Sequence, residues 1–261
     1  MSTRSLNWPL WSGFVLSPVA FLSYPLVFER WPPTRDLPWA NLLLFGVAAG
    51  LLGLGLRRAF LPGRLRWLRA ASGLIVTAVS VLIFANFAWS VFVRARQLPP
   101  SRHAPRIGER ALEFTLPDEN GAPVSLGALL SPATNPGAQA SKGVLLVFSM
   151  YASCRACNSE YRGIQRHLAE FVAMGVRPVV ISIDPPDVSH ALSREAGYTF
   201  TFLSDPGLSV IQRYDVADGD VARPAEFLLD SNGIVRWRNL TTSMFVRARP
   251  EQMLDAIRTL R

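Results

Sequence analysis

Three stretches without a charged residue lie in the first hundred positions, and they limit most strongly what this chain can fold into. They are Ser5–Phe28, Leu37–Leu56 and Ala70–Val93, each of twenty or more residues. At about 1.5 Å per residue, a helix of that length crosses a hydrocarbon core of roughly 30 Å. The sequence therefore predicts an all-α membrane region over residues 1–96, with three transmembrane helices over about 8–28, 38–56 and 71–93.

The first stretch has an alternative interpretation. Pro18 and Pro25 interrupt it, and a cleaved signal peptide has a similar apolar core. However, only Arg4 precedes the apolar run, and no small-residue cleavage site follows Phe28. Six of the seven tryptophans lie in this part of the chain near segment ends, where an amphipathic ring prefers the headgroup layer. We therefore expect a helix here rather than a signal peptide.

The net positive charge belongs entirely to this apolar part. Residues 1–100 hold ten arginines and two acids, whereas residues 101–261 hold seventeen basic and seventeen acidic groups, so the first part accounts for the whole +8. A nucleic-acid surface needs basic residues clustered on a folded face. We therefore expect a membrane, and no nucleic acid, as the partner of this region.

The arginines also predict an orientation. Five of them fall between the second and third stretches: Arg57, Arg58, Arg64, Arg66 and Arg69. The connection between the first and second stretches has two, partly offset by two acids. Because short cytoplasmic loops carry the excess of basic residues, we expect the five-arginine loop inside, in a multi-pass protein of the inner or plasma membrane. Everything after Val93 is then extracytoplasmic.

A different pattern follows the third stretch. Residues 97–107 read QLPPSRHAPRI, a Pro-rich linker of extended character. Beyond it, over 108–261, strands alternate with helices, which predicts an α/β fold with a central mixed sheet covered by helices. The expected strands are Glu113–Pro117, Val124–Leu126, Gly143–Phe148, Val179–Ile183, Thr199–Leu203, Ala225–Leu229 and Ile234–Arg238. The expected helices run from Cys157 to Gly175, over Asp187–Ala196, over Gly207–Tyr214 and from Pro250 onward.

The chain has two cysteines, three positions apart. Cys154 and Cys157 lie between the apolar strand and the start of the first helix of this domain. There, unpaired backbone N–H groups and the helix dipole favour the thiolate, which is the attacking species in disulfide exchange. Arg155 adds positive charge, and the spacing lets the two sulfurs close a disulfide. The pattern favours a redox dithiol.

A metal site and a static disulfide are two other roles for the cysteine pair. A zinc site needs three or four ligands, and His103, His167 and His190 have no ligand spacing to the pair, so we expect no metal and no cofactor. A static disulfide in a non-catalytic membrane scaffold stays open, although so short a loop gains little chain entropy.

A resemblance rests on several stretches in consistent order. They are Phe114–Gly121, Val144–Phe148, Cys154-x-x-Cys157-x-x-Glu160, Phe202–Pro206 and Arg223–Gly233. Through them, roughly residues 107–260 resemble the thioredoxin superfamily, specifically the redoxin group (alkyl hydroperoxide reductase and thiol-specific antioxidant) and the membrane-tethered thioredoxins of cytochrome c maturation. The resemblance implies a thioredoxin-like fold with the dithiol at the first helix. It also implies that Pro224 is a cis-proline whose backbone receives the substrate chain.

The sequence departs from both groups. Where peroxiredoxins have a threonine three residues before the attacking cysteine, Tyr151 stands before Cys154, and Pro224 stands where an arginine is usual, with Arg223 as a neighbouring substitute. Where thioredoxin has a buried acid on the preceding strand, this chain has Phe148. Proton transfer then falls to Glu160 or to water.

These observations predict a membrane-anchored thiol–disulfide oxidoreductase. Cys154 would attack a disulfide of a protein substrate, and Cys157 would resolve the mixed disulfide across Pro224. Because residues 1–100 contain no cysteine, a separate redox partner must recycle the dithiol. The alternative is a thiol peroxidase with Cys157 as the attacking thiol, since Cys157-x-x-Glu160 is similar to the peroxiredoxin pattern.

Overall fold

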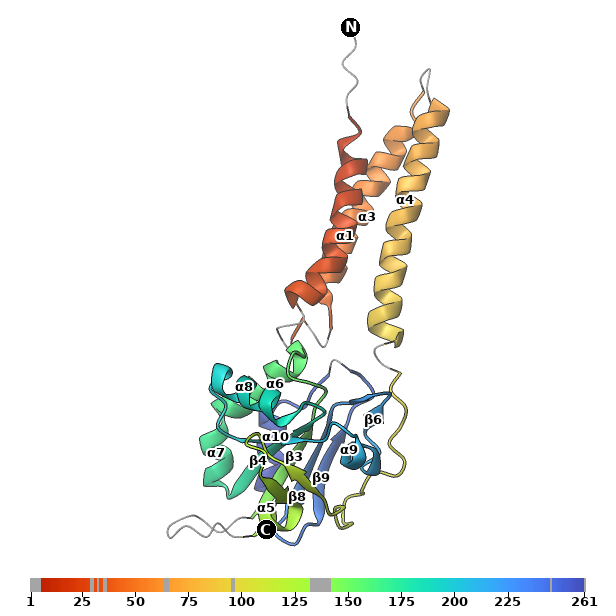
Figure 1. Ribbon diagram of the computed structural model, residues 1–261. Helices are drawn as coiled ribbons and strands as arrows, with labels where there is room; N and C mark the ends of the chain where they lie inside the picture. The colour runs from red at the N-terminus through yellow and green to blue at the C-terminus, as the bar shows by residue number, and fades with distance from the viewer. Residues whose placement is uncertain are drawn as a thin grey trace. The chain divides into compact units, whose positions relative to one another are not determined.

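The chain divides into two compact units in the computed structural model: residues 1–96, called here the helical unit, and residues 97–261, called the redoxin unit (Figure 1). The structure describes residues 6–28, 31, 33–34, 37–62, 66–94, 97–131, 142–244 and 246–260. Most of the segment 131–142, predicted as a loop, lies outside these residues.

Three long helices form the helical unit. They are α1 (Trp8–Leu26), α3 (Trp39–Ala59) and α4 (Arg66–Ala88), and α4 continues into the π-helical turn η2 (Trp89–Val93). The spans Trp39–Ala59 and Arg66–Val93 are long and apolar enough to cross a membrane, a property that some core helices of soluble proteins share. Helix α1, which contains Pro18 and Pro25, is not among these candidate spans. In the described part of the chain, the structure thus contains all three predicted helices, and two of them are candidate membrane spans.

Helices α1 and α3 pack closely at glycines. A Cβ added at Gly55 of α3 would lie 2.5 Å from the backbone nitrogen of Leu10, and one at Gly13 of α1 would lie 2.9 Å from the carbonyl oxygen of Ala48. In contrast, a Cβ at Gly46 or at Gly50, which form a G-x-x-x-G pattern, would meet no atom within 4 Å. The close approach therefore depends on Gly13 and Gly55, since only a residue without a side chain fits there.

A five-stranded mixed sheet is the centre of the redoxin unit, with the order β5-β4-β3-β8-β9. Its strands are β3 (Gly143–Phe148), β4 (Val176–Ser182), β5 (Thr201–Ser204), β8 (Ala225–Asp230) and β9 (Val235–Leu240). Strands β3, β4 and β5 are parallel, whereas β8 is antiparallel to both β3 and β9. Strand β3 is buried along its whole length, which confirms the interpretation of its uninterrupted apolar run.

Helices cover both faces of this sheet (Figure 1). One face packs against α6 (Arg155–Arg166), α7 (Leu168–Ala173), α8 (Pro186–Ala196) and α10 (Pro250–Arg258), and the other against α5 (Leu126–Leu130) and α9 (Ser209–Arg213). Because side chains alternate along a strand, Val144 and Leu146 enter the core on the α9 side, and Leu145 and Val147 enter the core under α6. The predicted α/β sandwich is therefore confirmed.

Short hairpins complete the redoxin unit. β1 (Thr115–Pro117) pairs with β2 (Pro123–Ser125), and β6 (Ala217–Asp218) pairs with β7 (Val221–Ala222). Between β8 and β9, the N–H of Gly233 donates to the carbonyl of Asp230 at 2.9 Å, and Gly233 has φ +75°. A residue with positive φ after such a turn gives the right-handed twist that joins two antiparallel strands, so glycine is required here.

Two local features differ from the sequence-based expectation. The helix expected from Cys157 to Gly175 is divided at His167, where φ is −105° and ψ is 8°, into α6 and α7. The residues expected to form an extended linker instead pack on the redoxin unit. The side chains of Leu98 and Ala104 are buried, and the N–H of Leu98 donates to the carbonyl of Thr242 at 3.2 Å.

Candidate active site: a closed dithiol at a helix N-terminus

Cys154 is the N-cap residue of α6, and Cys157 lies in its first turn. The chain leaves the buried end of β3 and turns, and the carbonyl of Tyr151 accepts the N–H of Cys154 at 3.0 Å. The Asn158 side chain holds this turn by donating to the carbonyl of Ala152 at 2.6 Å. The sequence-based placement of the pair between strand and helix is confirmed.

The two cysteines form a disulfide, with Cα atoms 5.3 Å apart. The Sγ of Cys154 also accepts the backbone N–H of Cys157 at 3.2 Å, as a capping side chain does. The exposed fraction is 9% for Cys154 and 0% for Cys157. Both residues are thus largely enclosed, and Cys154 is the more exposed of the two.

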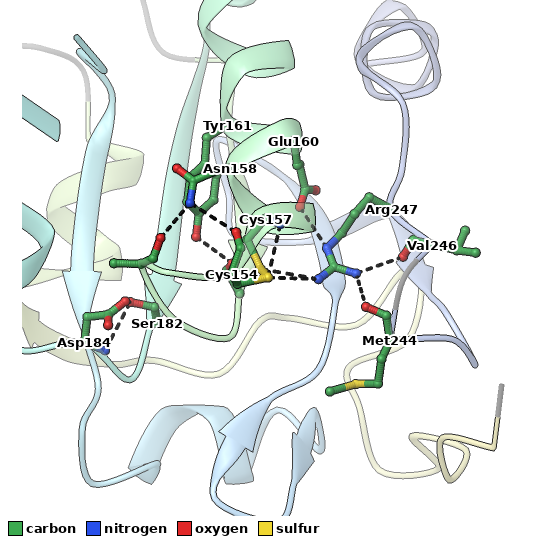
Figure 2. The surroundings of a disulfide bond; sticks show 12 residues. Cys154, Cys157, Asn158, Glu160, Tyr161, Ser182, Asp184, Met244, Val246 and Arg247 are labelled. Carbon is green, nitrogen blue, oxygen red and sulfur yellow. Dashed lines mark hydrogen bonds and ion pairs between the residues drawn. A yellow bond between two sulfur atoms is a disulfide. The ribbon is translucent and has the colours of Figure 1, made fainter. Parts of the chain in front are cut away.

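Arg247 contacts both sulfurs from the segment between β9 and α10. Its Nη2 lies 3.4 Å from the Sγ of Cys157 and 3.8 Å from the Sγ of Cys154 (Figure 2). The guanidinium is held by the carbonyls of Met244 and Val246, to which Nη1 donates at 2.6 and 3.2 Å. A buried positive charge at this distance stabilises a thiolate on either sulfur, in addition to the helix N-terminus.

Two buried carboxyl groups lie on the other side of this guanidinium. The Oε2 of Glu160 is 3.4 Å from the Nε of Arg247, and each side chain is 1% exposed. Glu226 of β8 is fully buried and hydrogen-bonded to Glu160, and its Oε2 accepts the side-chain amide of Asn239 at 2.6 Å. Burial raises the pKa of Glu226, although its hydrogen bonds and Arg247 act in the opposite direction.

Polar groups also lie behind the dithiol, toward β3 and β4. The hydroxyl of Tyr161 donates to the Oγ of Ser149 at 2.5 Å, and burial raises the pKa of Tyr161. Asp184 follows β4 and accepts the hydroxyl of Ser182 at 2.9 Å, and burial raises its pKa as well. Both groups are thus biased toward the neutral form around the dithiol.

Pro224 and Arg223 differ from what the resemblance implies. The bond between Arg223 and Pro224 is trans, so the cis-proline prediction is wrong, and Pro224 is buried at the start of β8. Arg223 does not substitute for the peroxiredoxin arginine, because its guanidinium donates to the carbonyl of Pro99 and the hydroxyl of Ser101 instead of the dithiol. Of the predicted site residues, the structure brings Cys154, Cys157 and Glu160 together.

Sequence reasoning missed Arg247 and Glu226. Arg247 is 90 positions from Cys157 and stands in a stretch with other arginines, so no local pattern distinguishes it. Glu226 can be recognised in the sequence, because it is the one charged residue inside the otherwise apolar run Ala225–Leu229. A carboxyl group in the middle of a buried strand needs partners, and that requirement indicates a polar site.

Comparison with known proteins agrees with this geometry. Residues 107–238, just over half of the chain, match the AhpC/TSA family. Two Mycobacterium tuberculosis sequences named as peroxiredoxins are 31% identical over 104 residues, which is 40% of this chain and 60% of theirs. The methylamine utilization protein MauD of Paracoccus denitrificans is 30% identical over 173 residues, 60% of this chain and 68% of its own length. The chain thus spans well under two thirds of the mycobacterial relatives.

Solved structures share the fold of the redoxin unit. The peroxidoxin BcpB of Mycobacterium tuberculosis superimposes with a TM-score of 0.52 at 24% identity, over 60% of this chain and 99% of its own. AhpC of Enterococcus faecalis gives 0.51 at 18% identity, over 59% of this chain and 91% of its own. These similarities confirm the thioredoxin-like fold. The family match over residues 107–238 shows that the chain belongs to the AhpC/TSA family, whose members are oxidoreductases.

Proposed function

We propose that the protein is a membrane-anchored thiol–disulfide oxidoreductase that exchanges disulfides with protein substrates outside the cytoplasm. In the reducing direction, the Cys154 thiolate attacks one sulfur of a substrate disulfide and the other leaves as a thiolate. Cys157 then attacks the Sγ of Cys154, releases the first substrate sulfur and restores the disulfide. The substrate chain lies near Pro224, which immediately precedes β8 at the sheet end that carries the dithiol.

The difference in exposure between the two sulfurs carries this proposal. Cys154 reaches the surface at 9% exposure, and Cys157 is fully buried beneath it. An attacking thiol that must meet a folded protein needs access, whereas a resolving thiol needs only to reach its neighbour. The arrangement supports Cys154 as the nucleophile, Cys157 as the resolving thiol and Glu160 as the group that handles the proton.

Two observations support the membrane and the partner. The helical unit contains two spans long and apolar enough to cross a bilayer. The five arginines at their connected ends and in the short loop between them favour a cytoplasmic location for that end. Both cysteines of the chain lie in the redoxin unit, so a separate redox partner must reduce or oxidise them. An alkaline phosphatase fused after residue 97 should be active if the redoxin unit is extracytoplasmic, and inactive if it faces the cytoplasm.

The enzymatic proposal is tested on the full chain in detergent micelles. With dithiothreitol as reductant, reduction of insulin disulfides should fall to background in both Cys154→Ser and Cys157→Ser, because each sulfur performs one of the two exchanges. Ser153→Ala, which changes an exposed neighbour of the dithiol, is the matched control and should keep the activity. A disulfide that dithiothreitol cannot reduce would contradict the proposal and leave the scaffold interpretation.

A second candidate function is a thiol peroxidase. It is favoured by the contact of Arg247 with the Sγ of Cys157 and by the acid three residues after Cys157, an arrangement that could stabilise an attacking thiolate. Hydrogen peroxide consumption that is lost in Cys157→Ser and kept in Cys154→Ser would establish it. The complete burial of Cys157 supports the first proposal instead, because peroxide must reach that sulfur.

A further inference from the structure

Glu226 places a second carboxyl group in the core beneath the dithiol, in addition to the one on α6. The side-chain alternation of β8 puts Phe227 on the α9 face of the sheet and Leu228 on the α6 face. Glu226 therefore shares the α6 face with Leu228, and its cross-strand neighbour on β3 is Val147, which packs on that same face. The carboxyl group thus lies in the layer between the sheet and the helix that carries Cys157.

The contacts of Glu226 require a bound proton. A hydrogen bond joins it to Glu160, and two carboxyl groups can share one only when one of them is protonated. The nearest positive charge is Arg247, which is 1% exposed. Two ionised carboxylates beside one guanidinium would leave a net negative charge in the core, whereas one shared proton makes the three groups neutral.

Burial favours the neutral form of Glu226, whereas the polar groups around it favour its ionised form. From α6 comes the carboxyl group of Glu160. From the segment before α10 come the Arg247 guanidinium and the backbone N–H of Ala248, which donates to the carboxyl group. From β9, Asn239 donates to Oε2 at 2.6 Å. Among the described residues, these are the groups that face Glu226.

We propose that Glu226 and Glu160 hold one proton between them and that this proton moves to Cys157 when the disulfide is opened. Glu160 stands three residues after Cys157 on α6, so their side chains are neighbours on one helix face. Glu160 is the group that transfers the proton, and Glu226 is the positioning residue that keeps it there. This inference rests on the proposed disulfide exchange, and it adds a residue to that site.

The step balances as follows. A thiolate of the reducing partner bonds to the Sγ of Cys154, the bond between Cys154 and Cys157 breaks, and its electron pair goes to the Sγ of Cys157. That sulfur takes the proton of the carboxyl pair, which becomes doubly ionised beside Arg247 until solvent returns a proton. In the reverse direction, the pair first releases its proton to solvent and then accepts the Cys157 proton as that sulfur attacks Cys154, and the departing thiolate is protonated by solvent.

The first test looks for the shared proton directly, by infrared spectroscopy of the oxidised full chain in detergent. The wild type should show the carbonyl stretch of a buried carboxylic acid, which is lost in Glu226→Gln, because Glu160 alone then ionises beside Arg247. Asp230→Asn is the matched control: Asp230 lies on the same strand, bonded to Arg236 away from the dithiol, and should leave the band in place. Absence of the band from the wild type would overturn the inference.

The second test follows the proton during reduction. Glutamine has the shape of a protonated glutamate, so Glu226→Gln should keep the fold while it removes the shared proton. Reduction of the disulfide by dithiothreitol should then slow by roughly 10²-fold, as for a lost general acid, and added imidazolium buffer should partly restore the rate. Asp230→Asn should show neither effect. A wild-type rate and pH profile in Glu226→Gln would overturn the proposal.

These tests separate the two proposals. If dithiothreitol fails to reduce the wild-type disulfide, the proposed disulfide exchange is wrong, whereas the infrared band still decides whether the proton is shared. If the wild type is reduced and only Glu226→Gln behaves normally, disulfide exchange stands and the role of Glu226 is wrong.

Discussion

The helical unit and the redoxin unit distribute their apolar and charged side chains in opposite ways. In the described part of the chain, most of the exposed large apolar residues belong to the helical unit, and the redoxin unit contributes Ile107, Val172 and Val188. The charged side chains buried among the described residues all belong to the redoxin unit: Glu160, Asp205, Arg223, Glu226, Asp230 and Arg247.

This contrast agrees with the membrane location that we propose for the helical unit. In water, apolar side chains are driven inside, and the redoxin unit follows that rule while it buries a few charges with partners. The helical unit exposes leucines and valines along α1, α3 and α4, as a surface that contacts lipid does. The predictions below test each half of the contrast, from the largest expected effect to the smallest.

Removing the carboxyl group of Glu226 should cause the largest loss of stability. Glu226→Ala deletes one member of the buried cluster, leaves the Asn239 amide without its acceptor and opens a cavity, so we expect a loss of about 3–5 kcal/mol. Glu226→Gln, which keeps the volume and the acceptor, should stay within about 1 kcal/mol of the wild type. Guanidinium unfolding followed by circular dichroism measures both. Equal losses would contradict this account, because the lost volume and the lost acceptor would then contribute nothing.

The same carboxyl group gives a pH dependence. Its pKa is raised above the ordinary value of 4.5 in the folded protein, so the folded state holds a proton that the unfolded state has released. Stability should therefore be highest below that ordinary value and fall as the pH rises from it through the raised pKa. The unfolding free energy of Glu226→Gln, measured over the same range, should lack this decline. A parallel decline in both proteins would assign it to another group.

A charge on the outer surface of α4 should next weaken membrane insertion. Leu82 is 68% exposed in the middle of α4, and Leu82→Arg should cost about 2.5–3.5 kcal/mol of insertion free energy. Val172→Arg, at an apolar residue 53% exposed on the redoxin unit, is the matched change and should have no such effect. The fraction of protein that stays in carbonate-washed membranes measures this. If the same fraction of both variants stayed in the membranes, the proposed difference between the surfaces of the two units would be wrong.

Close packing inside the helical unit gives a smaller effect. Gly55→Ala places a Cβ against the backbone of Leu10 and should destabilise by about 1–3 kcal/mol, as overpacking does. Gly46→Ala adds the same atom to the same helix in open space and should be neutral or stabilise by up to about 1 kcal/mol. Thermal unfolding in detergent distinguishes them. A similar response at both glycines would place the α1–α3 contact elsewhere.

The smallest predicted effect concerns a buried charge held by backbone rather than by an opposite charge. The carboxylate of Asp205 accepts the N–H groups of Ser209, Val210 and Ile211 at 2.8–2.9 Å, at the start of α9. Asp205→Ala should cost about 1–2 kcal/mol, because these donors lose their acceptor. Asp205→Asn, which keeps one acceptor oxygen, should lose less. An unchanged midpoint of guanidinium unfolding in Asp205→Ala would contradict this account.

Local patterns in the sequence predicted the parts of the molecule that depend on local physics. The apolar run Gly143–Phe148 indicated a strand buried on both faces, and the two cysteines after it indicated a dithiol at a helix start. Residues that meet across the fold could not be found in this way. Arg247 reaches the sulfurs from the segment after the last strand, and no spacing rule connects positions 90 residues apart.

Other features also depend on contacts that no local pattern reveals. The two glycines of the G-x-x-x-G pattern in α3, Gly46 and Gly50, have no neighbouring atom where a Cβ would be, whereas Gly55 contacts α1. The partner helix decides which face of α3 is in contact, and the spacing of glycines within α3 does not reveal it. The trans bond before Pro224 and the turn of Arg223 toward Pro99 depend on how residues 97–101 pack, which the sequence of the dithiol region does not reveal.

The burial of Cys157 has a practical consequence for finding the molecules with which this protein reacts. In the proposed exchange, Cys154 attacks and the fully buried Cys157 resolves, so every covalent intermediate would join its partner through the sulfur of Cys154. The variant Cys157→Ser lacks the resolving thiol that would break this mixed disulfide. Substrates and the redox partner should therefore accumulate as mixed disulfides with Cys154, which a reducing agent releases. The Cys157→Ser variant could thus be used to capture both the substrate and the redox partner that recycles the dithiol.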